Sequence, residues 1–208
     1  MNPDDPGRRY WNSFAKRYDR SMTLLGRSLP RMVELVGEVV CGSADLLEVA
    51  AGTGLVTPTL ARSAVNVVAT DYAPAMVERL EARVRGLGLE NVRIELADLY
   101  SLQYEPSSFD AVVATNVLHL VPDLPGALAA LRRVLCPGGR LVSPTYCHDE
   151  TVTSWLVSRA LAVSGFPGQR RFSTRTLRQA LETSGLHVGR TETLPGLIPI
   201  GFIEGTWD

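Results

Sequence analysis

Residues 46–54 read L-L-E-V-A-A-G-T-G, and this stretch decides the fold. An apolar, strand-like run breaks within two residues of Glu48 into alanines, a threonine and two glycines. Such a break after a strand indicates that the backbone approaches a ligand closely. Read from Gly52, the spacing places Thr57 where a dinucleotide-binding fingerprint has its third glycine. Read from Ala50, the stretch is A-x-G-x-G, the tighter spacing found with ligands that lack phosphates, and we expect a negative φ at Ala50.

Short apolar runs alternate with amphipathic segments from residue 45 onward. Strand-like composition marks residues 44–50, 65–71, 91–98 and 109–116. Residues 73–88 carry apolar side chains at helical spacing, and Pro74 suits the first turn of that helix. Residues 131–141 read as the end of a helix, a Pro-Gly-Gly turn and a strand. Strands separated by helices predict right-handed crossovers and a parallel sheet with both faces buried.

The pattern changes after Ser143. Residues 151–165 and 174–185 read as helices, and residues 186–194 and 197–205 as strands. We expect these two strands to close the sheet as an antiparallel hairpin. Residues 8–20 and 30–40 are expected to be helical and to pack over the carboxyl edge of the sheet. The predicted fold class is α/β: a Rossmann-like, doubly wound, mostly parallel seven-stranded sheet with an antiparallel C-terminal hairpin and N-terminal helices over the site.

Composition and charge exclude several classes of protein. The chain of 208 residues has 21 Lys and Arg against 22 Asp and Glu, so its overall charge offers no footprint for nucleic acid or an anionic membrane. Its three cysteines form no C-x-x-C pair, which argues against a disulfide framework and a metal site. No apolar run approaches the roughly 18 residues that span a bilayer, and no secretory signal is visible. We therefore expect a cytoplasmic protein without stable membrane insertion.

Each of the first three predicted strands ends at or beside an acid. Glu48 lies within the first strand, Asp71 ends the second, and Asp98 follows the third. Ligands of open α/β sheets bind outside the carboxyl ends of the strands. One carboxylate at Asp71 can accept from both hydroxyls of a ribose, and Asp98 can accept from an exocyclic amine while the N–H of Leu99 reads a ring nitrogen.

Each acid also has a structural alternative. Glu48 can instead cap a nearby helix or bind backbone amides. Asp71 can be only the N-cap of the helix that begins near Pro74. Asp98 can be an ordinary solvated turn residue.

The motifs E-V-A-A-G-T-G, V-V-A-T-D and A-D-L, followed by L-R-R-V-L-C-P-G-G-R-L, together resemble those of the class I S-adenosylmethionine-dependent methyltransferases. The resemblance covers roughly residues 45–145 and departs from the family at Ala50, where glycine is commoner. Residues 10–19, Y-W-N-S-F-A-K-R-Y-D, resemble the N-terminal helix of small-metabolite members, in which the tyrosine before the aspartate closes over the cofactor.

The resemblance implies S-adenosylmethionine as cofactor, S-adenosylhomocysteine as product, and methyl transfer by in-line displacement. It implies that the whole chain, residues 1–208, is a single domain with an N-terminal helical cap (1–44), a cofactor-binding core (45–145), and acceptor-side helices with closing strands (146–208). The implied cofactor-binding residues are Tyr18, Glu48, Ala50, Ala51, Gly52, Gly54, Asp71, Tyr72, Met76, Asp98, Leu99 and Asn116.

The acceptor side offers three candidate catalytic residues, His119, Tyr146 and His148, which follow the fourth and fifth predicted strands. A base is needed only for an acceptor that arrives protonated. His119 can instead pack the turn after its strand, and His148 can be a surface loop residue. Cys147 is the only thiol expected to face the acceptor.

The acceptor itself is expected to be a small molecule. Apolar residues around Trp155 and in the C-terminal segment suggest an apolar, aromatic or lipid-like compound, although a core role explains them equally well. Arg170, Arg171, Arg175 and Arg178 form a basic cluster that either recognises an anionic acceptor or is a solvated helix face. Two alternatives to a methyltransferase remain: a catalytically silent cofactor-binding or partner protein of this fold, and a nicotinamide-dependent oxidoreductase. Nucleic acid is not expected as a partner, and the sequence leaves the oligomeric state open.

Overall fold

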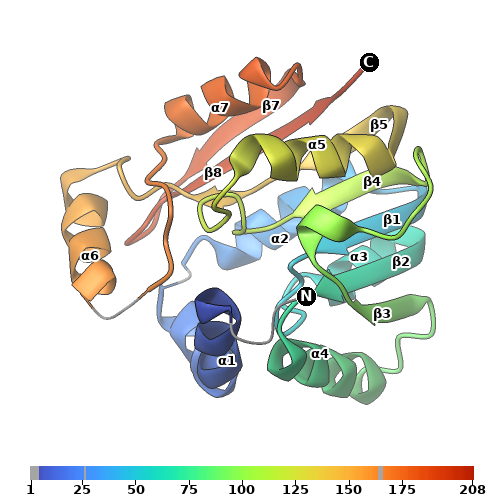
Figure 1. Cartoon of the computed structure of the whole chain (residues 1–208), viewed down its shortest axis with the longest axis horizontal. Helices are drawn as coiled ribbons and strands as arrows, with labels where there is room; N and C mark the ends of the chain where they lie inside the picture. Colours follow the sequence, from blue (N-terminus) through green and yellow to red (C-terminus); the bar gives the residue numbers. More distant parts are fainter. Residues whose placement is uncertain (1–4, 26, 164–165) are drawn as a thin grey trace.

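The computed structural model describes residues 5–25, 27–163 and 166–208. Its centre is one eight-stranded sheet with the order β3-β2-β1-β4-β5-β8-β6, and β7 pairs with the free edge of β8 (Figure 1). The parallel strands are β1 (Ser43–Val49), β2 (Ala64–Asp71), β3 (Val92–Leu96), β4 (Phe109–Ala114) and β5 (Leu135–Val142). The remaining strands are β6 (Thr145–Tyr146), β7 (His187–Leu194) and β8 (Ile200–Thr206).

This topology confirms the predicted parallel sheet and antiparallel hairpin. The order of the strands reverses between β1 and β4, which is the switch point where such sheets bind ligands. The sheet has one strand more than the seven predicted, because the short β6 pairs with β8 just beyond the end of β5. The Pro-Gly-Gly turn expected before β5 lies inside it, with Gly138 at φ +72°.

Helices cover both faces of the sheet, and the side chains of β1 show why. Leu46 packs with α2 (Leu29–Val39) and α3 (Thr57–Ser63), whereas the next residue, Leu47, packs with α5 (Leu124–Val134) and α7 (Thr174–Thr183). Successive strand residues face opposite sides, so a continuous apolar run is needed to bury both faces. The helix α4 (Pro74–Gly86) packs on β2 and β3, as predicted, while α3 was not predicted.

The two N-terminal helices occupy different places. Helix α1 (Pro6–Leu25) lies beside α4 near the carboxyl ends of the strands (Figure 1). Only the first turn of α2 borders that region, through Leu29 and Met32, and the rest of α2 runs along the sheet face. Its apolar stripe explains this position, because Met32, Leu35 and Val36 are fully buried there.

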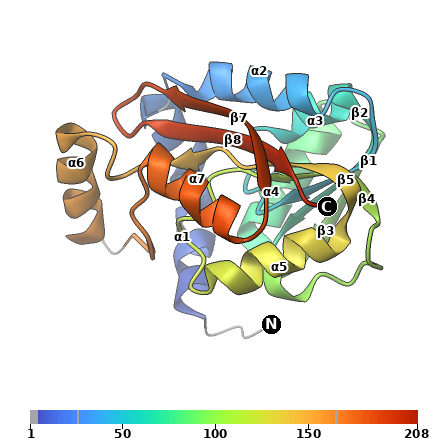
Figure 2. The same ribbon diagram turned by 90° about the horizontal axis from the view of Figure 1, so that it is seen from above.

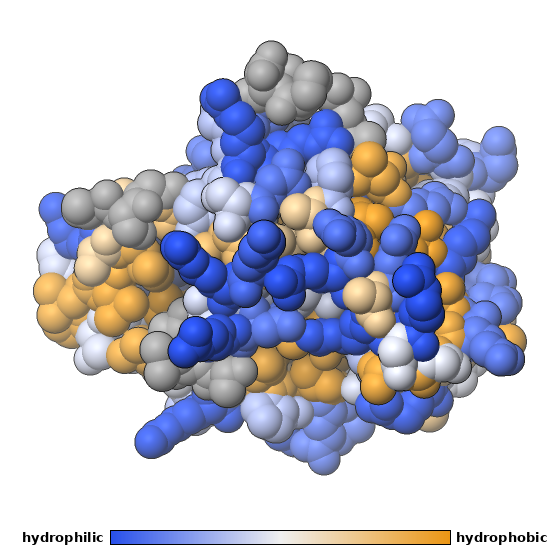
Figure 3. All heavy atoms as spheres, turned by 90° about the horizontal axis from the view of Figure 1, so that it is seen from below, coloured by the Kyte–Doolittle hydropathy of each residue, from blue (hydrophilic) through white to orange (hydrophobic). Residues whose placement is uncertain are grey.

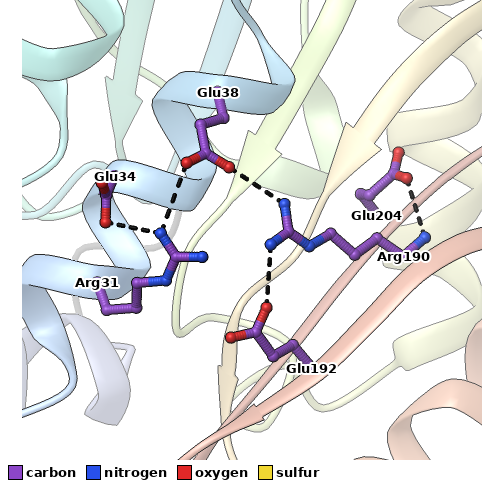
Figure 4. A network of polar contacts seen from close by, with 6 residues as sticks. All are labelled: Arg31, Glu34, Glu38, Arg190, Glu192 and Glu204. Atoms are coloured by element: carbon purple, nitrogen blue, oxygen red, sulfur yellow. Dashed lines mark hydrogen bonds and ion pairs between the residues drawn. The ribbon is translucent and has the colours of Figure 1, made fainter.

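A polar network fixes α2 to the closing hairpin (Figure 4). The guanidinium of Arg190 on β7 lies 3.1 Å from a carboxylate oxygen of Glu38 on α2 and 3.1 Å from one of Glu192. The backbone N–H of Arg190 donates to Glu204 on β8. Exposed pairs of this kind stabilise little individually, so the buried contact of Phe202 with the α2 side of the core carries more of the attachment.

Helix α6 (Val152–Val163) projects at one end of the molecule (Figures 1 and 2). Val157 and Leu161 pack against the core, while much of the helix surface is exposed. The predicted end of this helix, at residues 164–165, lies outside the described residues. Across the described ranges, no helix combines the length and apolar character that a membrane span requires.

Candidate functional site

The loop between β1 and α3 turns through left-handed backbone at alternate residues. Ala50, Gly52 and Gly54 have φ values of +50°, +59° and +79°. The N–H of Ala51 donates to the carbonyl of Thr70 at 2.9 Å, which fixes the loop to the end of β2. The expectation of a negative φ at Ala50 is therefore wrong: the turn needs left-handed geometry from its first residue. A non-glycine residue in that region costs about 1–2 kcal/mol.

Asp71 holds this loop from the end of β2. One carboxylate oxygen accepts from the N–H of Gly52 at 2.9 Å, and the other accepts from the N–H of Ala73 at 2.9 Å. Burial raises the pKa of Asp71 to about 6, while the hydrogen bonds to backbone N–H groups oppose that rise. The N-cap alternative is wrong, because α4 has Ala73 at its N-cap and the carboxylate bonds no residue within that helix.

Glu48 lies fully buried beneath the loop. Its carboxylate accepts from the hydroxyl of Thr57, the first residue of α3, at 2.6 Å. Burial raises the pKa of Glu48 to about 8, and the nearby charge of Asp71 adds to the rise. Thr57 stands where a dinucleotide-binding loop has its third glycine. Its hydrogen bond to Glu48 therefore links that position to the acid within β1. No backbone amide bonds this carboxylate among the described contacts.

Asp98 opens a short 3-10 helix, η1 (Leu99–Ser101), at the end of β3. One carboxylate oxygen accepts from the N–H of Tyr100 at 3.0 Å, as in an ordinary turn. The side chain is half-buried. Tyr72 lies nearby: burial raises the pKa of its phenol, and the charges of Asp5, Asp71 and Asp98 add to the effect. Met76 is buried beside Ala73 and supports this corner from α4.

Helix α1 lies over the glycine loop, and Asp19 adds contacts there that the sequence did not predict. Asp19 accepts from the hydroxyl of Thr53 at 2.5 Å and from Arg83 of α4 at 2.6 Å. Arg83 also donates to the carbonyl of Gly54 at 3.1 Å. The ring of Tyr18 lies over Gly52, about 3.8 Å from where a side chain there would begin. One feature of the sequence could have indicated these contacts: the Tyr-Asp pair that ends residues 10–19, the stretch that resembles the N-terminal helix of the family.

Asn116 marks the end of β4, on the other side of the switch point. Its φ is +52°, and its N–H donates to the carbonyl of Pro144 at 2.7 Å. The side-chain oxygens of Asn116 and Thr115 are buried without a hydrogen-bond partner in the described part of the chain. Both residues line a small cavity together with Tyr18, Glu48 and Ala50. Buried polar atoms without partners fit a site that a polar ligand completes.

Two histidines meet on the acceptor side. The rings of His119 and His148 lie 5.3 Å apart, and both side chains are buried. Nδ1 of His119 and both ring nitrogens of His148 find no partner among the described residues. Burial lowers both pKa values, that of His119 to about 3. The surface-loop alternative for His148 is therefore wrong. His119 is buried in the turn after β4, as its alternative proposed, and its ring also lies beside His148.

Aromatic side chains from distant segments surround these histidines. Phe166 stacks on His119 at 6.1 Å and lies 6.2 Å from both Tyr10 and Trp11 of α1. Tyr146 lies 6.2 Å from His119, and its hydroxyl points to the sulfur of Met22. We call this set the acceptor-side cluster: Tyr10, Trp11, His119, Tyr146, His148 and Phe166. Sequence reasoning missed the aromatic members from α1 and Phe166.

On this side one expectation is wrong, and one pair of alternatives can be compared with the structure. Cys147 points away from the histidines, because neighbouring residues of an extended segment face opposite sides, and its thiol lies in the core near Thr174. Of the two alternatives for the arginines, the solvated helix face fits Arg175 and Arg178 on α7. Arg170 donates to the carbonyls of Val121 and Pro122, and Arg178 pairs with Glu182 at 2.8 Å. Arg171 and Arg175 are exposed.

A larger hollow of about 450 Å³ lies elsewhere, at the amino ends of the parallel strands. Asp110, Cys136 and Gly138 line it. Because ligands of such sheets bind at the carboxyl ends, this hollow is not part of the site. Among the described residues, no group of His, Cys, Asp and Glu side chains could hold a metal ion.

The fold and the site define a class of protein: a Rossmann-like α/β protein with acids at the ends of three neighbouring strands around a left-handed loop. Residues 47–143 match the family model described as a methyltransferase domain. Over these residues the chain is similar to the class I S-adenosylmethionine-dependent methyltransferases, as the resemblance in the motifs predicted.

Individual relatives support this assignment. The chain is 35% identical over 155 residues to the malonyl-[acyl-carrier protein] O-methyltransferase of Halorhodospira halophila, covering 70% of this chain and 52% of that protein. It is 35% identical over 152 residues to the demethylmenaquinone methyltransferase of Clavibacter sepedonicus, covering 72% and 60%. The chain thus spans between about half and three fifths of these curated relatives. A crystal structure of a methyltransferase from Thermotoga maritima shares the fold, with a TM-score of 0.77 at 18% identity over 96% of this chain and 99% of that one.

Proposed function

We propose that this protein transfers a methyl group from S-adenosylmethionine to a small apolar acceptor that carries an ionisable hydroxyl. The observation that carries the proposal is the tie between Asp71 and Gly52, which joins the end of β2 to the left-handed loop at the switch point. A nicotinamide enzyme is disfavoured, because the third position of its glycine fingerprint is Thr57 and that residue is bonded to Glu48.

The residues present fit the cofactor. Asp71 uses one hydrogen bond on each carboxylate oxygen, so further lone pairs can accept from ribose hydroxyls. The free oxygen of Asp98 and the N–H of Leu99 suit an adenine ring. The unpartnered oxygen of Asn116 suits the ammonium of the methionyl group, and Tyr18 covers the loop. The other proposed cofactor contacts are Glu48, Ala50, Ala51, Gly52, Gly54, Tyr72 and Met76.

When bound, S-adenosylmethionine supplies a methyl group on a positively charged sulfur, and this group passes to the acceptor by in-line displacement. The chain has to orient the acceptor, exclude water and remove a proton. His148 is the proposed base: burial lowers its pKa, so its ring is neutral near pH 7, and both nitrogens are unpartnered. His119 remains neutral and positions the ring of His148. Tyr146, whose pKa is raised to about 12 by burial, keeps its proton and can donate a hydrogen bond.

The acceptor-side cluster favours a ring-containing acceptor, because aromatic faces from α1 and Phe166 border the two histidines. The relatives' names point to different acceptors, demethylmenaquinone in one case and a malonyl group on a carrier protein in another. The aromatic lining supports the first kind more than the second. In this assignment residues 1–44 cap the site, residues 45–145 bind the cofactor and residues 146–208 complete the acceptor side of one domain, in a protein that we place in the cytoplasm.

Calorimetric titration tests the cofactor. S-adenosylhomocysteine should bind with a micromolar dissociation constant, and NADH should not bind. The reverse result would overturn the proposal.

A screen of phenols, quinols, amines and thiols, with S-adenosylhomocysteine release as readout, tests the reaction. Release with a phenol or quinol is expected. Cofactor binding without release from any acceptor class would favour the silent binding protein instead.

A further inference from the structure

The outer face of α1 is mostly basic, with Ser13 lying between its basic side chains. Arg9, Lys16, Arg17 and Arg20 are exposed, and their spacing places them on one side of the helix. None of them forms an ion pair with a described residue. The acid between them, Asp19, faces inward to Arg83. A chain with a net charge of −1 therefore concentrates positive charge on one helix.

Helix α6 carries apolar side chains on its exposed side as well as on the side that packs on the core. Ser154 and Ser158 are buried, with exposed fractions of 0% and 7%. Val152, Trp155 and Leu156 are exposed by 78%, 42% and 57%. Exposed apolar groups gathered on one helix mark a surface that binds something else.

These two surfaces lie next to each other. Phe166, just beyond α6, contacts Tyr10 and Trp11 of α1, and its N–H donates to the carbonyl of Leu161 in α6. Figure 3 shows this side of the molecule, with hydrophobic atoms gathered over α6 beside hydrophilic side chains over α1. On α6 itself, the guanidinium of Arg159 lies 5.0 Å from the ring centre of Trp155.

We propose that α1 and α6 together form a docking face for the surface of an anionic lipid bilayer. Basic side chains are attracted to anionic headgroups, and the adjacent apolar side chains enter the boundary between headgroups and acyl chains. A Trp with an Arg on its face suits that boundary, since one part is apolar and the other stays in contact with headgroups. An acidic protein would explain the basic helix but not the exposed apolar side chains of α6 beside it.

This face also borders the acceptor-side cluster through Phe166, Tyr10 and Trp11. An acceptor dissolved in the bilayer would then reach the site from the docked side. That step rests on the proposed function, whereas binding to vesicles does not require it.

Vesicle co-sedimentation of the full chain tests the proposal. The protein should sediment with vesicles of equal parts phosphatidylglycerol and phosphatidylcholine, and at least about tenfold less with phosphatidylcholine alone. Raising the salt to about 0.5 M should release most of it, because screening is then strong within a few ångströms. Equal binding to both vesicles, or no binding to the anionic ones at low salt, would overturn the proposal, and the second result would leave an acidic protein as the occupant of the basic helix.

Two sets of variants divide the face. Lys16→Glu/Arg17→Glu/Arg20→Glu and, separately, Trp155→Ser/Leu156→Ser should each weaken binding to anionic vesicles at least about tenfold. The matched control, Arg132→Glu/Arg175→Glu/Arg178→Glu, makes the same charge change on α5 and α7 and should bind within about threefold of the parent. A control that loses as much binding as the α1 variant would show that net charge alone is responsible. Calorimetry with S-adenosylhomocysteine on the same variants separates this result from a failure of the cofactor proposal.

Discussion

The buried acids of the cofactor side have hydrogen-bond partners within the protein, whereas the buried histidines of the acceptor side leave ring nitrogens without one in the described part of the chain. Asp71 and Glu48 are tied to their surroundings, by the N–H groups of Gly52 and Ala73 in one case and by the hydroxyl of Thr57 in the other. His119 and His148 lie as deeply buried but leave three ring nitrogens without a partner in the described residues.

This difference shows on which side the protein supplies the hydrogen-bond partners before a ligand binds. A buried polar group without a partner costs about 1–3 kcal/mol. At Asp71 and Glu48 the cofactor side has met that cost with its own N–H and hydroxyl groups before any ligand binds, while the side-chain oxygens of Thr115 and Asn116 at the end of β4 are left open. On the acceptor side the bond is left for the acceptor to make, so selectivity should reside there.

The largest expected effect is on the acceptor side. His148→Asn should lower kcat by about a hundredfold or more, because positioned acid–base groups contribute on the order of 10²–10⁴. The affinity for S-adenosylhomocysteine should remain within about twofold. The measurements are steady-state kinetics on an acceptor found in the screen, and calorimetry. Turnover equal to that of the parent would remove His148 as the base.

The cofactor side should respond in the opposite sense. Asp71→Ala removes a carboxylate that bonds two backbone N–H groups, and the affinity for S-adenosylhomocysteine should fall by about 10- to 100-fold, or 1–3 kcal/mol. Asp45→Ala is the control, since its carboxylate accepts from Asn66 at the far end of β1. Unchanged affinity in Asp71→Ala would remove this residue from the site, and equal losses in both variants would indicate general destabilisation.

Protonation gives the two sides opposite effects on stability. Folding raises the pKa of Glu48 from 4.5 to about 8, so the folded state holds the extra proton between these values and stability falls as the pH rises through that window. Folding lowers the pKa of His119 from 6.5 to about 3, so the unfolded state holds the extra proton and stability falls as the pH drops from 6.5 toward 3.

Urea unfolding as a function of pH tests this contrast. Asp71 is half ionised near pH 6 and largely ionised by about pH 7, so Glu48→Gln should flatten the decline of the unfolding free energy between pH 7 and 8. His119→Phe should reduce the acid-side decline and leave the slope between pH 7 and 8 unchanged. Parallel curves for the parent and both variants would contradict the assignment of these two groups.

Sequence reasoning reached the two sides unequally for a physical reason. The loop, Asp71 and Asp98 follow their strands directly, so the rule that ligands bind at carboxyl ends places them without knowledge of the packing. The acceptor-side cluster joins α1, the segment after β4, β6 and Phe166, and no local pattern says that these segments meet.

Orientation was harder to predict than position. Cys147 and His148 are neighbours, and a shift of one residue in an extended segment reverses which of them faces the site. The ion pair of Asp19 with Arg83 and the basic face of α1 likewise depend on how α1 docks. The net charge of the chain argued against an anionic partner. It does not show that the packing of α1 gathers basic side chains on one face.

The smallest expected effect concerns backbone strain at Ala50, in the loop between β1 and α3 on the cofactor side. Ala50 has a φ of +50°, a geometry that costs a non-glycine residue about 1–2 kcal/mol. Ala50→Gly relieves that cost but loses about 0.4–1 kcal/mol through the greater freedom of the unfolded chain. The net result should be a gain of about 0.5–1 kcal/mol in the unfolding free energy, measured by urea titration. Ala51→Gly is the matched control: Ala51 is not among the residues with positive φ, so the same change should lose about 0.4–1 kcal/mol. Equal losses in the two variants would mean that the loop does not hold Ala50 in left-handed geometry in solution, and the strain would then belong to neither side of the site.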